Sequence, residues 1–332
     1  TPGFKAAEHT MPHLDWFEAP AEKNGACMLL ISGGGYNNCC DTWWIDKVAK
    51  KFTELGYVCV SLTYRTPRPQ GLPIHQSAWQ DGQRAVRLVR NEAQKRGFDP
   101  EKIGALGFSA GSHLTVLLGT SALTPAYQAV DELDQTPCHI NWAVPIYTAY
   151  ALTDGLTGPN TRNGDAIDAR LSDVFKFDAK TCPMALFHGG TDNYSPNGAT
   201  QIYRQLRRMK IPAELHLFAD RGHGFMGDPK KGEAGAAYDH WLDRVCEFMR
   251  QMNFDGRLGA VVELDREGAA ELGGEGRQID AGDVPERAGQ RGERRDVGGD
   301  DVLDAGDLDL DHDRGAVEQP AGRDRHRGRA AQ

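Results

Sequence analysis

Short apolar runs alternate with longer segments of helical period, and this alternation constrains the fold more than any other feature of the sequence. The runs "ACMLLIS" (26–32) and "YVCVSLTY" (57–64) flank a segment of helical period at 42–56. A strand, a helix and a second strand in this order are typical of a parallel sheet covered by helices. The sequence therefore predicts an α/β fold with a mostly parallel central sheet and helices on both faces.

The same alternation continues to about residue 252. Further strands are predicted at 102–108, 140–147, 184–189 and 213–218, and further helices at 77–97, 110–120, about 197–210 and about 234–252. Gly56 and Gly97 are expected to end the helices that precede them. A polar segment between Tyr150 and Thr181 is rich in Gly, Asn, Asp and Thr, and it stands where a lid or substrate loop would be inserted.

The end of the chain differs in composition from the rest. From Asp255 to Gln332 there is no Lys, Cys, Met, Phe, Trp, Tyr, Ser, Thr or Asn. Such a segment buries too little apolar surface to offset its ordering entropy. We therefore expect a globular catalytic domain over residues 1–253 and a low-complexity, disordered tail over residues 254–332. A frame-shifted or read-through gene end is one hypothesis for the tail, and its mixed charge signs argue against a nucleic-acid partner.

The bulk composition excludes several classes of function. A net charge of −9 gives no electrostatic footprint for nucleic acid. No apolar run approaches the ~20 residues that span a membrane. No signal peptide is visible, but the chain starts at Thr1 without Met, so its localisation stays open. Neither nucleic acid nor a membrane is expected as a partner, and the oligomeric state is open as well.

Seven cysteines make an odd number, and they show no zinc-type spacing. Several lie in apolar runs, among them Cys27 and Cys59, where a thiol behaves as a small hydrophobe. We expect free, mostly buried cysteines rather than a disulfide framework. Phosphate-binding glycine motifs are missing, and no His, Cys or Asp cluster has metal-ligand spacing. The sequence therefore predicts neither a metal nor another cofactor.

The stretch "IGALGFSAGSHL" (103–114) places Ser109 between two glycines at the end of a predicted strand and the start of a predicted helix. Glycine on both sides fits a tight corner that lifts the serine hydroxyl toward solvent. The amino end of the following helix favours negative charge that develops nearby. Ser109 is thus the candidate nucleophile, although such a string also arises by chance in a chain with 39 glycines.

A serine hydroxyl needs a base and an orienting acid, and both follow later strands. Asp192 lies in "FHGGTDNYSP" after the strand at 184–189, and His223 lies in "FADRGHGFMGD" after the strand at 213–218. The order Ser, Asp, His is the one that this sheet topology requires. Asp220 and Asp228 are rival acids on the loop of His223 itself.

Three further histidines receive structural interpretations. His188 helps to shape the turn before Asp192. His113 stands one helical turn beyond Ser109, which favours packing over catalysis. His216 alternates with leucines, so it reads as a strand residue with a role in the sheet.

An acyl-transfer intermediate carries an oxyanion that needs preorganised N–H donors. The stretch "ISGGGYNN" (31–38) places three glycines after the first clear strand, where the backbone can approach a substrate closely. Gly34 and Gly35 are the candidate donors, together with the amide of Ala110.

Together these motifs resemble the α/β-hydrolase superfamily, and more narrowly bacterial esterases related to acetylxylan and feruloyl esterases, near the hormone-sensitive-lipase and dienelactone-hydrolase branches. The matching pieces are "SGGGY" (32–36), "GYVCVSLTYR" (56–65), "DGQRAVRLVR" (81–90), "DPEKIGALGFSAGSHL" (99–114), "HGGTD" (188–192) and "GHGF" (222–225). The resemblance covers about residues 25–250. It implies an α/β-hydrolase fold and a serine hydrolase of carboxylic esters, with Ser109, Asp192 and His223 as triad.

This resemblance also implies a substrate class, because members often remove acetyl groups from plant polysaccharides such as xylan. Ser32 and Ser112 depart from the usual pattern of such esterases, and neither departure removes a catalytic group. "LDWFEAP" (14–20) is the one candidate for the strands that usually open the fold, which suggests a truncated amino end. Two alternatives stay open: a prolyl-oligopeptidase-like serine peptidase, and a non-catalytic binding protein on a hydrolase scaffold.

Overall fold

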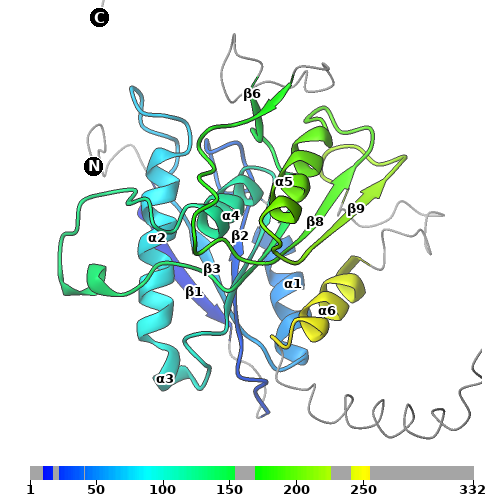
Figure 1. Cartoon of the computed structure of the whole chain (residues 1–332). Coiled ribbons are helices and arrows are strands. Elements are labelled where there is room, and N and C mark those ends of the chain that lie inside the picture. The colour runs from blue at the N-terminus through cyan, green and yellow to red at the C-terminus, as the bar shows by residue number, and fades with distance from the viewer. Residues whose placement is uncertain (1–9, 18–21, 41, 154–168, 226–240, 255–332) are drawn as a thin grey trace, which may run out of the picture. The chain divides into compact units, whose positions relative to one another are not determined.

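The computed structural model describes residues 10–17, 22–40, 42–153, 169–225 and 241–254. All of them belong to one compact unit, residues 1–274. The expected tail over 254–332 lies outside the described residues except for Phe254. Figure 1 shows the helices and strands of the described part.

A seven-stranded sheet forms the centre of this unit, in the order β1-β3-β2-β4-β5-β8-β9. Its strands are β1 (His13–Phe17), β2 (Cys27–Ile31), β3 (Val58–Thr63), β4 (Ile103–Phe108), β5 (Trp142–Ile146), β8 (Met184–Gly189) and β9 (Ala213–Phe218). Only β1 runs antiparallel to its neighbour, and the other described pairings are parallel. The carboxyl ends of six strands therefore meet at one edge, where ligands bind in such sheets.

Each central strand is apolar on both faces because helices cover both faces. In β2, Cys27, Leu29 and Ile31 pack into one hydrophobic cluster, and Met28 and Leu30 pack into a second cluster on the opposite face. Alternation with period two sends successive side chains to opposite sides of the sheet. This explains why the run at 26–32 is apolar throughout.

Helices lie over both faces of the sheet (Figure 1). Five longer helices contribute side chains to these two clusters. The first cluster receives side chains from α2 (Gln76–Asn91), α4 (Ala110–Thr120) and α5 (Asn197–Arg208). The second receives side chains from α1 (Thr42–Glu54) and α6 (Trp241–Gln251). The predicted α/β fold with helices on both faces is confirmed.

Most element boundaries agree with the prediction to within two residues. The candidate strand at 14–20 is observed as β1 (His13–Phe17), and residues 18–20 lie outside the described residues. Two predicted helices also differ. The predicted helix at 77–97 is divided at Glu92 into α2 and the short α3 (Ala93–Arg96). Glu92 keeps right-handed helical backbone angles, so the helical pattern of side chains runs on through the break. Gly97 ends α3 in the left-handed conformation, as expected. Of the helix predicted at 234–252, residues 226–240 lie outside the described residues.

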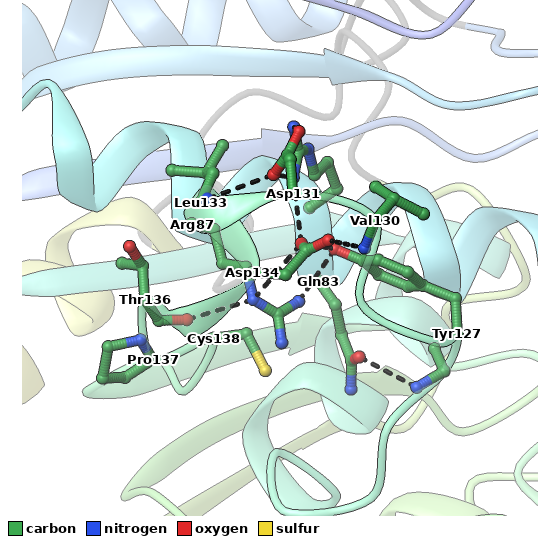
Figure 2. Close-up of polar contacts among 12 residues, drawn as sticks. Gln83, Arg87, Tyr127, Val130, Asp131, Leu133, Asp134, Thr136, Pro137 and Cys138 are labelled. Carbon is green, nitrogen blue, oxygen red and sulfur yellow. Dashed lines mark hydrogen bonds and ion pairs between the residues drawn. The ribbon is translucent and has the colours of Figure 1, made fainter.

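A long connection between α4 and β5 was not assigned any element from the sequence. It contains the short 3-10 helix η1 (Glu132–Gln135) and lies against α2. Figure 2 shows the polar contacts that fasten it. Arg87 of α2 donates to the Thr136 carbonyl oxygen and to the Tyr127 hydroxyl, at 3.0 Å each, and Asp134 accepts the N–H of Val130 at 2.8 Å.

The segment between Tyr150 and Thr181 is described at both of its ends. There β6 (Leu152–Thr153) and β7 (Arg170–Leu171) form a small antiparallel pair. Residues 154–168 lie outside the described residues, so the lid or substrate loop expected here remains a prediction.

The seven cysteines all lie in the described ranges and form no disulfide there, and Cys27, Cys59, Cys138 and Cys182 are buried. This agrees with the expectation of mostly buried thiols rather than a disulfide framework. Of the helices in the described ranges, none combines the length and the apolar character that crossing a membrane requires.

Candidate active site

Ser109 occupies a sharp turn between β4 and α4. Its backbone angles are φ 55° and ψ −116°, which a residue with a side chain adopts only under constraint. The constraint comes from the end of β5, because the Ser109 N–H donates to the Ile146 carbonyl oxygen at 3.0 Å. The Ser109 carbonyl oxygen accepts the N–H of His113 at 3.1 Å, which starts the helix.

The two flanking glycines are required by space. A Cβ atom at Gly107 would overlap the Gly111 carbonyl oxygen and the Thr115 hydroxyl, and a Cβ atom at Gly111 would overlap the carbonyl oxygens of Ile31 and Ser32. The elbow therefore forms because β2, β4 and α4 approach one another more closely than any larger residue allows.

The three candidate residues come together at the carboxyl edge of the sheet. Ser109 Oγ lies 2.8 Å from His223 Nε2. His223 Nδ1 lies 2.8 Å from Oδ2 and 3.0 Å from Oδ1 of Asp192. The imidazole thus bridges a hydroxyl and a carboxylate from two other loops, each within hydrogen-bond distance.

The surroundings of Asp192 keep its carboxyl ionised, and this in turn sets which nitrogen of His223 carries a proton. Burial raises the pKa of this carboxyl, but hydrogen bonds from His188, His223 and the Tyr194 N–H, with the charge of His223, outweigh burial and lower the pKa to about 2. An ionised carboxylate only accepts hydrogen bonds, so His223 carries a proton on Nδ1. Its Nε2 is then free to accept the proton of Ser109.

His188 is a second histidine on the same carboxylate. Its Nε2 lies 2.8 Å from the Tyr194 carbonyl oxygen and 3.2 Å from Asp192 Oδ2. A carbonyl oxygen only accepts, so Nε2 of His188 carries the proton and donates to both groups. The structural interpretation of His188 agrees with these contacts, but the sequence did not reveal its direct bond to the acid.

The rival acids do not contact the imidazole within the described ranges. The side chain of Asp220 is 76% exposed and pairs with Arg221 at 3.3 Å. Asp228 lies outside the described residues. His216 stacks on Phe187 within the sheet, with ring centroids 4.6 Å apart, as a strand residue would.

The glycine loop after β2 brings Gly34 and Gly35 to the carboxyl edge of the sheet, beside Ser109 and His223. The Gly33 carbonyl oxygen accepts the N–H of Cys40 at 3.2 Å, and the Gly34 carbonyl oxygen accepts the N–H of Asn37 at 3.0 Å. In a trans peptide the C=O and the N–H point in opposite directions. The N–H groups of Gly34 and Gly35 therefore point away from the N–H groups of Cys40 and Asn37. Within the described ranges no backbone carbonyl accepts from either amide.

Ala110 stands directly after the nucleophile as the first residue of α4. Its N–H therefore has no acceptor within the helix. The side chain of Ala110 is fully buried, so only its backbone is positioned for a role at Ser109. The neighbouring departure from the family pattern, Ser112, is also buried, and its hydroxyl lies 2.7 Å from that of Thr148.

A pocket of about 410 Å³ opens beside Ser109 and His223. Three tyrosines, Tyr147, Tyr150 and Tyr194, give it aromatic walls, and the rings of Tyr147 and Tyr194 each lie with their centroids 5.0 Å from that of His223. Most of the lining residues were not predicted from the sequence. The lining consists of Gly33, Gly34, Gly35, Asn37, Cys40, Phe108, Ser109, Tyr147, Tyr150, Asn193, Tyr194, His223 and Gly224.

In the part of the chain that the structure describes, no group of three or more His, Cys, Asp or Glu residues is arranged to hold a metal ion.

The sheet order, the strained serine corner and the Ser-Asp-His order define the class of α/β-hydrolases. A profile of the BD-FAE family matches residues 14–206, more than half of the chain and including Ser109 and Asp192. The chain belongs to this family, the bifunctional feruloyl/acetyl xylan esterase family of α/β-hydrolases.

Curated relatives are similar to this chain at low identity. Endo-1,4-beta-xylanase B of Butyrivibrio fibrisolvens is 29% identical over 67% of this chain and 36% of its own length. An acetylxylan esterase of Xylanibacter ruminicola is 26% identical over 62% of this chain and 42% of its own length. The chain thus spans less than half the length of either relative.

A solved structure supports the fold alone. An acetyl ester-xyloside bifunctional hydrolase from Caldicellulosiruptor lactoaceticus superimposes with a TM-score of 0.62 at 24% identity, and the match covers 77% of this chain and 93% of that chain.

Proposed function

We propose that this protein is a serine carboxylesterase that removes acetyl groups from carbohydrate esters through an acyl-serine intermediate. One observation carries the proposal: the continuous path from Ser109 Oγ through the His223 imidazole to the Asp192 carboxylate, with donor–acceptor distances of 2.8 Å at each step.

In the first half of the reaction, Ser109 Oγ attacks the ester carbonyl carbon while its proton passes to Nε2 of His223. Asp192 stabilises the imidazolium and keeps Nδ1 protonated throughout. The carbonyl oxygen becomes an oxyanion, for which Gly34, Gly35 and Ala110 are the proposed N–H donors. His223 then returns its proton to the departing alcohol, and the acyl-serine remains.

In the second half, water takes the place of the alcohol. His223 accepts a proton from the water, which attacks the acyl carbon, and the proton returns to Ser109 Oγ as the acid leaves. The partial exposure of the His223 side chain, 27%, is consistent with access for this water.

The substrate class rests on two supports. The pocket combines tyrosine rings with the amide side chains of Asn37 and Asn193, a mixture suited to the faces and hydroxyls of sugars. Two curated relatives bear the names of a xylanase and an acetylxylan esterase. We propose plant polysaccharide esters such as acetylated xylan as the substrates.

The experiment compares three substrates with purified protein: acetylated xylan, p-nitrophenyl acetate and an aminoacyl anilide. Release of acetate from xylan together with hydrolysis of the small ester supports the proposal. Faster cleavage of the anilide than of either ester would instead indicate a peptidase. No turnover of any of the three would favour a non-catalytic binding protein.

A further inference from the structure

Tyr36, the last residue of the glycine loop, has a backbone conformation that its side chain disfavours. Its φ is 63°, in the left-handed region, and its side chain is fully buried. A non-glycine residue stays in this region when its surroundings hold it there. Gly34 and Gly35 precede it with φ values of 118° and 61°, so three successive residues adopt positive φ.

The contact that holds Tyr36 comes from the nucleophile helix. Its hydroxyl lies 2.8 Å from Nδ1 of His113, which is fully buried on α4. His113 also donates its backbone N–H to the Ser109 carbonyl oxygen. One hydrogen bond therefore joins the end of the glycine loop to the turn of helix that carries the nucleophile.

Both partners of this bond are neutral. Burial raises the pKa of Tyr36 well above its usual value, with a smaller contribution from Tyr150. Burial lowers the pKa of His113 well below its usual value, with a smaller contribution from His75. Nε2 of His113 has no hydrogen-bond partner among the described residues, so the bond to Tyr36 is the one hydrogen bond of this ring there.

The start of the loop has an anchor of its own. The Tyr64 hydroxyl lies 3.2 Å from the carbonyl oxygens of Ser32 and Gly33. Tyr36 packs edge-on against Tyr64 and stacks on Tyr150, with ring centroids 5.7 Å and 6.1 Å away. Between the two anchored ends stand Gly34 and Gly35, whose backbones have no side chain to fix them.

We infer that the Tyr36–His113 hydrogen bond positions the amides of Gly34 and Gly35 against Ser109, so that Tyr36 and His113 are positioning residues for ester hydrolysis. This inference rests on the proposed function, because it concerns the donors that would bind the oxyanion. Neither side chain lines the pocket beside Ser109, so both would act through the loop. If Tyr36 and His113 served only to pack the core, substituting them would change the free energy of unfolding and leave the chemical step unchanged.

Tyr36→Phe removes the hydroxyl and keeps the ring, so it tests the bond directly. Small displacements of catalytic groups cost up to about 100-fold in rate, and loss of a whole oxyanion donor costs about 100- to 1,000-fold. We expect kcat for p-nitrophenyl acetate to fall about 10- to 100-fold, with KM within about twofold of wild type. Tyr127→Phe is the matched control, since it removes a tyrosine hydroxyl that bonds Asp134 outside the pocket.

A second readout separates positioning from packing. Phenylboronic acid forms a tetrahedral adduct on a nucleophilic serine, and one of its oxygens takes the place of the oxyanion. Its inhibition constant should rise in Tyr36→Phe by about the same factor as kcat falls. The constant should not change in Tyr127→Phe, even where both variants lose similar stability in urea.

The partner residue supplies a rescue. His113→Asn keeps an acceptor near the position of Nδ1 and should retain most of the activity, whereas His113→Leu should lose as much as Tyr36→Phe. The double variant Tyr36→Phe/His113→Leu should lose no more than either single variant.

The inference would be overturned if Tyr36→Phe kept the kcat and the phenylboronic acid affinity of wild type. Additive losses of activity in the double variant would overturn it as well. A wild-type protein that hydrolyses no ester would overturn the proposed function and this inference with it. An active wild type with an unaffected Tyr36→Phe variant would overturn this inference alone.

Discussion

Asp192 Oδ2 lies 3.2 Å from Nε2 of His188, and the side chains of both residues are completely buried. The carboxylate thus receives one histidine from its own turn and a second, His223, from the loop after β9. Two histidines and a backbone N–H fix both oxygens of the acid, which leaves its carboxylate one orientation. The orientation of the candidate acid therefore depends on His188, four positions earlier in the chain, as well as on His223.

His188→Ala should loosen this arrangement and lower kcat by about 10- to 100-fold, because a misplaced carboxylate misplaces the imidazole. His188→Gln carries an N–H donor near the position of Nε2 and should recover most of the loss. Steady-state hydrolysis of p-nitrophenyl acetate by the two variants checks the prediction. Equal activity of His188→Ala and wild type would show that the orientation of Asp192 does not depend on this bond.

Asp192 also makes stability depend on pH. Its folded pKa of about 2 lies below the ordinary 3.8, so its contribution to stability is present above pH 4 and is lost as the pH falls toward 2. The shift corresponds to about 2 kcal/mol in total, of which about 1 kcal/mol is lost between pH 5 and pH 3. Asp192→Asn should remove that part of the pH dependence.

Urea unfolding at pH 5 and pH 3 measures this difference for wild type and Asp192→Asn. Asp220→Asn, which changes an exposed carboxylate nearby, serves as control and should keep the wild-type dependence. If Asp192→Asn and wild type lost the same free energy of unfolding between pH 5 and pH 3, folding would not hold the Asp192 carboxyl in its ionised form.

Gly34→Ala tests the glycine loop. The residue has φ 118°, and a Cβ atom there would overlap the backbone and side-chain oxygens of Asn38. The loop must shift to accept it, so kcat should fall about 100- to 1,000-fold if the amides serve the oxyanion. Gly71→Ala is the matched control, because Gly71 also has positive φ, at 79°, but has open space around its Cβ position. A loss of the same size in both variants would trace the effect to backbone strain alone.

The sheet was predictable because burial on both faces makes each central strand a continuous apolar run, as in β2 and β4. The helix after Ser109 was predicted with its observed bounds, since glycines 107 and 111 mark the corner that starts it. These features depend on local sequence and on the general rule that a strand buried on both faces is apolar throughout.

Other features depend on contacts between distant residues, which a single sequence does not display. The η1 segment forms because Arg87 of α2 bonds to Tyr127 and Thr136, some 40 to 49 positions later. The Tyr36–His113 bond joins residues 77 positions apart. Tyr147 and Tyr150 line the pocket because the loop after β5 holds both at positive φ, a conformation that tyrosine itself does not favour.

The central claim is that Ser109 is a nucleophile activated by His223. A fluorophosphonate probe tests it most directly, with mass spectrometry to locate the label and p-nitrophenyl acetate to follow turnover. We predict one label per wild-type chain, on Ser109, no label on Ser109→Ala, and a fall in kcat for that variant on the order of a million-fold. Labelling of Ser109→Ala at the wild-type rate, or a loss of activity under about tenfold, would contradict the account.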